Sequence, residues 1–171
     1  MLTIFHLLIS LLILFIMSNF INIQPVMAFS FVLGSIIIDI DHLITIYHIK
    51  KEPYNTARKL LKSRQIRSFL IFLSKRHKEI DLLRFHNYVG FLLIFLTFEI
   101  TLLLDRHILE LLFLSILTHM VEDQLEDIWT LGHLKNWLWP FNMARGCWGL
   151  VVLSIALLVI SYIQIWLHLL V

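Results

Sequence analysis

Five apolar segments, separated by polar stretches and one long basic stretch, constrain this chain more than any other feature. They cover residues 2–22, 26–48, 85–104, 108–122 and 148–170. About 20 apolar residues in a helix cross the core of a bilayer, where the backbone must satisfy its own hydrogen bonds. Hydrophobic residues make up 59% of the chain, against about 45–50% in soluble domains. The sequence therefore predicts an all-α integral membrane bundle with about five transmembrane helices, in a single domain of residues 1–171.

The segment of residues 49–84 holds eleven of the 14 Lys and Arg residues. Basic loops of membrane proteins face the cytoplasm, so we expect this segment and the N-terminus on the cytoplasmic side of the cell membrane. Residues 57–73 read as a basic amphipathic helix, which could lie on anionic lipid or attract a phosphorylated substrate. The alternative is a loop that only sets the topology. Because topology accounts for the charge and no nucleic-acid-binding motif is recognised, we expect no nucleic-acid partner.

Asp39, Asp41 and His42 follow directly on an apolar run. A charged side chain near the bilayer core costs about 2.5–3.5 kcal/mol, so such groups face a protein interior, a partner charge or a metal. On a helix, Asp39 and His42 would share a face. With the basic segment inside, the alternation of spans brings further His and Asp residues to the same side of the membrane. These are His6, His86, His119 and Asp123.

His119 and Asp123 are spaced four residues apart, on one face of a helix, and Asp127 extends that stripe if the helix continues. Such a pair can bind one metal, or the carboxylate can hold the imidazole in place. A single cysteine, Cys147, rules out a Cys-based zinc cluster. Imidazole and carboxylate ligands favour zinc, with manganese or iron as alternatives, and the set is large enough for one or two ions.

Each of these side chains also has a plainer interpretation, since a histidine within a helix is more often hydrogen-bonded packing than a ligand. Residues 123–147 read as a polar and aromatic cytoplasmic segment, and Glu99 has no evident partner. The other histidines are expected at the surface or at an interface. They are His48, His77, His107, His133 and His168.

The run GSIIIDIDH resembles the G-x-L-x-P-D-I-D-H signature of the YdjM-like (LexA-regulated) membrane-bound metal-dependent hydrolases. Four further motifs of that family have similar counterparts in this chain, in the same order. They are an early His, the second His of H-R-G-x-T-H-S, H-L-x-x-D and L-W-P-F. The counterparts are His6, Phe85-His86-Asn87, His119-Met-Val-Glu-Asp123 and Leu138-Trp139-Pro140-Phe141. The chain departs from the family at Ile38, in place of Pro, and at Asp81, in place of the first His of H-R-G-x-T-H-S. The resemblance implies a membrane-embedded metallohydrolase.

Metal-dependent hydrolysis of an ester or phosphoester at the cytoplasmic membrane boundary is the leading hypothesis. Asp41 or Asp127 would orient a ligand or act as general base. The metal ligands would be Asp39, His42, His86, His119 and Asp123, with His6 in addition. Two other functions could use the same residues. A transporter would pass metal along them, and a non-catalytic membrane scaffold would use them as a structural metal site or a polar network.

Overall fold

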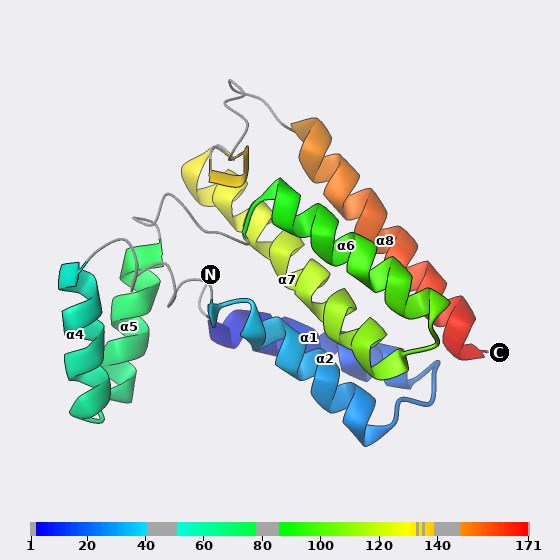
Figure 1. Cartoon of the computed structure of the whole chain (residues 1–171), viewed down its shortest axis with the longest axis horizontal. Helices are drawn as coiled ribbons and strands as arrows, with labels where there is room; N and C mark the ends of the chain where they lie inside the picture. The colour runs from blue at the N-terminus through cyan, green and yellow to red at the C-terminus, as the bar shows by residue number, and fades with distance from the viewer. Residues whose placement is uncertain are drawn as a thin grey trace.

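A computed structural model describes residues 3–40, 51–77, 86–132, 134, 136–138 and 148–170, and every element among them is helical. This confirms the all-α prediction for that part of the chain. The elements are α1 (Thr3–Ser18), α2 (Pro25–Ile37), α4 (Lys51–Lys62), α5 (Ile66–His77), α6 (Tyr88–Leu103), α7 (His107–Leu131), the short 3-10 helix η1 (Asn136–Leu138) and α8 (Trp148–Leu170). Figure 1 shows α1, α2, α6, α7 and α8 packed together as one bundle, with the α4–α5 hairpin to one side of it.

Helix α7 is the centre of the bundle and packs against α1, α2, α6 and α8 (Figure 1). Its apolar side chains Leu111, Leu114, Leu117 and Met120 are fully buried. Phe31 from α2, with Phe91 and Phe98 from α6, fills the space around them. One core therefore joins segments that are far apart in the sequence, and every other long helix is positioned relative to α7.

The backbones of helices α2 and α7 lie close together at Gly34. A Cβ atom added at Gly34 would lie 2.3 Å from the backbone oxygen of Leu112 and 2.9 Å from Cβ of Ser115. Only glycine leaves room for the two backbones at this distance. The adjacent Ser35 is consequently brought against the middle of α7, which matters for the site described below.

Helix α7 is longer than the sequence suggested. The fourth apolar segment was expected to end at residue 122, followed by a polar segment, but the helix continues through Leu131. Gly132 ends it, with a φ of 70° and its backbone N–H donating to the carbonyl of Ile128. Asp127 therefore belongs to the same helix as His119 and Asp123, as the stripe of three residues required.

The amphipathic helix expected over residues 57–73 is two helices, α4 and α5, which pack against each other. The break lies at residues 63–65, where Arg64 adopts a left-handed conformation with a φ of 56°. The Ser63 hydroxyl and the Gln65 amide donate to the last carbonyls of α4, including that of Leu60. Because these groups are satisfied locally, the chain can turn back and bury Phe69.

Helix α8 is long and apolar enough to cross a membrane. The apolar helices α1, α2 and α6 are shorter, and α2, which lies within the second expected span of residues 26–48, ends at Ile37. Large apolar side chains cover the outer faces of these helices, among them Phe15 (67% exposed), Phe29 (66%) and Leu103 (84%). A continuous apolar exterior of this kind is typical of a surface that contacts lipid or another protein.

Candidate metal centre

Helix α7 carries the two central residues of the site. His119 and Asp123 lie one helical turn apart and are both buried, with exposed fractions of 1% and 3%. Oδ2 of Asp123 lies 3.2 Å from Nε2 of His119. The spacing read from the sequence therefore corresponds to a direct contact within the bundle core.

Two further histidines meet the same carboxylate. Nε2 of His6, near the start of α1, lies 3.1 Å from Oδ1 of Asp123. Nε2 of His86 lies 3.3 Å from Oδ2. His86 directly precedes the N-cap of α6, Asn87, whose side chain accepts a hydrogen bond from the Gly90 amide and fixes the start of that helix. Asp123 thus has three imidazoles around it, one on one oxygen and two on the other.

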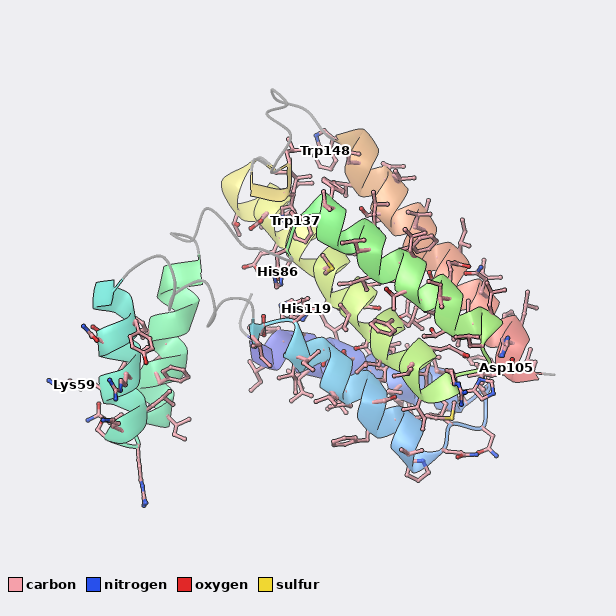
Figure 2. All side chains as sticks on the ribbon, in the orientation of Figure 1. Lys59, His86, Asp105, His119, Trp137 and Trp148 are labelled. Carbon is pink, nitrogen blue, oxygen red and sulfur yellow. The ribbon has the colours of Figure 1, made fainter. Side chains whose placement is uncertain are left out.

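Asp39 completes the group from the turn after α2. Its Oδ1 lies 3.4 Å from Nε2 of His119, so this nitrogen faces two carboxylates at once. Figure 2 shows His86 and His119 at the same end of the bundle. Segments from α1, α2, α6 and α7 therefore each supply at least one His or Asp to one buried cluster.

The outer nitrogens of two of these rings are held by groups that the sequence analysis did not identify. Nδ1 of His119 lies 2.7 Å from the backbone carbonyl oxygen of Ser35, and Nδ1 of His6 lies 2.6 Å from Oε2 of Glu122. Both acceptors require Nδ1 to carry the proton. In the neutral rings, each Nε2 then presents a lone pair towards Asp123, the tautomer that a metal ligand needs.

The cluster needs positive charge. Lone pairs on His119 and His6 point at carboxylate oxygens, which is unfavourable unless a proton or a metal ion lies between them. The rings of His6 and His119 are stacked, with centroids 3.7 Å apart, so two imidazolium charges here would repel strongly. Protons on both rings are therefore a poor way to balance the charge of Asp39, Glu122 and Asp123.

The donor spacing suits a metal ion. Two ligands at roughly 2.0–2.1 Å from a tetrahedral ion lie about 3.3 Å apart. The Nε2–Oδ separations of 3.1–3.4 Å around Asp123 and Asp39 agree with this value. Two groups could hold an ion: His6, His119 and Asp123, and Asp39, His86 and His119. Both groups include His119. Asp123 lies next to both groups, because its Oδ1 faces His6 and its Oδ2 faces His86 and His119.

Asp127 is connected to this cluster through Trp137. The indole Nε1 of Trp137 donates a hydrogen bond of 2.9 Å to Oδ2 of Asp127, and the indole packs edge-on against His86, with ring centroids 6.2 Å apart (Figure 2). Asp127 therefore positions the indole wall of the cluster.

The structure brings together five of the residues singled out in the sequence. They are His6, Asp39, His86, His119 and Asp123. Asp41 and His42 lie outside the described residues, as do Asp81 and the stretch 139–141. The sequence did not indicate that Glu122, the Ser35 carbonyl and Trp137 contact the histidines of the cluster. The one available signal was Glu122 itself, a second acid beside Asp123 and three residues after His119.

No family model, curated protein or solved structure matches this chain in the comparisons with known proteins. The resemblance to the YdjM-like hydrolases therefore rests on the motifs quoted above.

Proposed function

We propose that this protein is a membrane-embedded, metal-dependent hydrolase that cleaves an ester or phosphoester bond in a lipid-like or phosphorylated substrate. The observation that carries the proposal is the convergence of three imidazole Nε2 atoms, from His6, His86 and His119, on the one buried carboxylate of Asp123. Mixed imidazole and carboxylate donors in a closely spaced, buried set are typical of hydrolytic zinc sites.

The proposed location in a membrane is supported by the outer surface of the bundle. Helix α8 has the length and composition of a spanning helix, and large apolar side chains on α1, α2 and α6 face outward. We propose that these helices cross the membrane together with α7, which gives five spans. The basic hairpin α4–α5 follows α2 and precedes His86 in the chain, so it joins the bundle at the end that carries the cluster (Figure 2).

The proposed orientation of the bundle in the membrane follows from the basic hairpin α4–α5. Arg58, Lys59 and Lys62 are exposed on α4. By the positive-inside rule, the hairpin and the cluster belong on the cytoplasmic side. Exposed basic side chains there would also raise the local concentration of an anionic lipid headgroup or a phosphorylated substrate.

One or two metal ions would be held by Asp39, His86, His119 and Asp123, with His6 in addition. Zinc suits this set of ligands best, with manganese or iron as alternatives. A bound divalent metal lowers the pKa of a coordinated water and polarises an ester or phosphoryl oxygen. The chain's own residues provide the rest. Glu122 and the Ser35 carbonyl hold the two stacked rings in one orientation. Asp127 holds Trp137 against His86, and we propose that these two side chains exclude water from one side of the cluster.

The metal content of the detergent-purified protein tests the site. Wild type should retain zinc, manganese or iron by elemental analysis, and His119→Ala and Asp123→Asn should each lose the metal that this centre binds, so that their metal content falls by at least about one equivalent. Glu99→Gln is a matched control, because Glu99 is a carboxylate of α6 that contacts Gln164 on α8, outside the cluster. Equal metal content in wild type and both site variants, with folding intact, would contradict the proposal.

Hydrolysis is tested separately, with aryl phosphate mono- and diesters and phospholipids in mixed micelles. Turnover should be lost when a chelator removes the metal, should be restored by added metal, and should be absent in Asp123→Asn. A well-folded, metal-loaded protein that hydrolyses none of these would instead indicate a structural metal site. Metal flux into sealed vesicles would instead indicate a transporter. The hydroxyls of Ser30, Thr101 and Ser154 do not favour that function, because each already donates to a carbonyl of its own helix.

A further inference from the structure

A second group of ionisable side chains lies at the opposite end of the bundle from the candidate metal centre. His107 begins α7, Asp105 lies in the turn between α6 and α7, and His168 lies in the last turn of α8. Figure 2 shows Asp105 at the end where α6 and α7 meet, remote from His119. None of these residues belongs to the centre described above, and from the sequence both histidines were expected only at the surface or at an interface.

Glu110 of α7 also belongs to this group, and the four side chains form two close pairs. Nδ1 of His107 lies 3.1 Å from Oε2 of Glu110, and Nε2 of His168 lies 3.1 Å from Oδ1 of Asp105. The two histidine rings meet edge-on, with centroids 5.1 Å apart. Ligand atoms of His107, Glu110 and His168 all lie within 4.8 Å of one another. These separations suit donors that share one small cation, whose ligands lie about 3.3 Å apart in tetrahedral geometry.

Glu110 is the reason to expect a cation here. Its side chain is completely buried, and its Oε1 has no hydrogen-bond partner among the residues that the structure describes. A buried carboxylate without full compensation is strongly unfavourable. A neutral His107 can donate one hydrogen bond to Glu110 but cannot balance its charge. Asp105 adds a second negative charge, and the neighbouring Arg106 is exposed and takes part in neither pair.

We propose that His107, Glu110 and His168, with Asp105, form a second binding site for a divalent transition-metal ion of the zinc type. The two imidazoles and the Glu110 carboxylate match the ligand preference of zinc, and Asp105, paired with His168, adds a second negative charge that helps to balance the double charge of the ion. His107 is 43% exposed and Asp105 is 80% exposed, so an ion can enter from solution at this end. The bound ion connects the C-terminal turn of α8 to the start of α7, two elements that no covalent connection joins there.

The test uses the full-length, detergent-purified protein, with zinc as the probe. In the His119→Ala variant, which lacks the first centre, zinc should still bind with about one equivalent and should raise the apparent Tm. Adding His168→Gln or His107→Gln should remove that equivalent and the Tm response. Gln164→Ala, one turn before His168 on α8, is the matched control and should keep both.

The same variants made in the wild-type background separate the two sites. His168→Gln should lower the zinc content by about one equivalent and leave the metal bound by His119 in place, whether or not the protein is a hydrolase. The proposal is overturned if the His119→Ala protein binds no zinc, or if neither histidine variant lowers the amount bound. Both substituted histidines are partly exposed, so the variants are expected to fold.

Discussion

Glu122 and Ser35 give two histidines of the candidate metal centre a fixed direction. Glu122 binds the outer nitrogen of His6, and the Ser35 carbonyl binds that of His119. A hydrogen bond of this kind sets the tautomer, restrains the ring and increases the basicity of the ligating nitrogen. Neither group would touch the metal, so each acts through the ring that it holds.

Glu122→Gln should weaken metal binding without abolishing it. The amide can still accept a hydrogen bond from His6, but it lacks the negative charge that strengthens the bond. Loss of such a partner typically costs tenfold to hundredfold in metal affinity. Competition with a chromogenic chelator measures this change, with Glu99→Gln as the control. An affinity equal to that of wild type would show that Glu122 has no part in holding His6.

At this scale the sequence predicted the members of the cluster but not how they are held. Charge bias and the alternation of spans placed His6, Asp39, His86, His119 and Asp123 at one end of the bundle, and the structure places them there. The contacts of Glu122 and Ser35 join residues more than 80 positions apart. They depend on the rotation of each helix about its axis, which composition and spacing leave open.

Among the helices, the close approach of α2 to α7 controls the geometry of the centre. Gly34 permits it, and the next residue, Ser35, supplies the carbonyl that binds His119. The break at Arg64 and the continuation of α7 to Leu131 were not foreseen, because a left-handed non-glycine residue and a helix with a polar last third leave little signal in hydropathy.

Gly34→Ala should separate α2 from α7 and weaken the centre. The new methyl group would overlap the Leu112 carbonyl, and overpacking of this kind costs about 1–3 kcal/mol. Both the apparent Tm and the metal affinity should fall, because the hydrogen bond from His119 to Ser35 lengthens. Gly149→Ala is the matched control: a Cβ there meets nothing within 4 Å among the described residues, so neither quantity should fall. Equal behaviour of the two variants would contradict this account.

For the whole molecule, the proposed topology predicts which loops face each side of the membrane. In a Cys147→Ser background, Asn19→Cys marks the exposed turn after α1, and Ser63→Cys marks the exposed turn between α4 and α5. An impermeant maleimide should label Asn19→Cys in intact cells and should label Ser63→Cys only after permeabilisation. Labelling of both from the same side would rule out the proposed arrangement of spans.

Metal removal should destabilise the whole bundle, because the centre joins segments of α1, α2, α6 and α7. A ligand present at 100 times its dissociation constant stabilises the folded state by about 2.7 kcal/mol. For a chain of this size, that corresponds to a fall of about 5–10 °C in apparent Tm on chelation. The measurement is best made in a His168→Gln background, so that the second cluster does not contribute. Asp123→Asn in the same background should show no response to the chelator.

The length of α7 determines which measure of substrate concentration would govern the reaction rate. His107 and Asp123 lie roughly 24 Å apart along the helix, at 1.5 Å per residue. A bilayer's hydrocarbon core is about 30 Å thick, so when His107 lies at one boundary, Asp123 lies slightly inside the other. A lipid would then reach the centre by lateral diffusion within its own leaflet. Reaction rates should accordingly follow the mole fraction of substrate in a mixed micelle and fall when inert detergent dilutes the surface, even at constant bulk concentration.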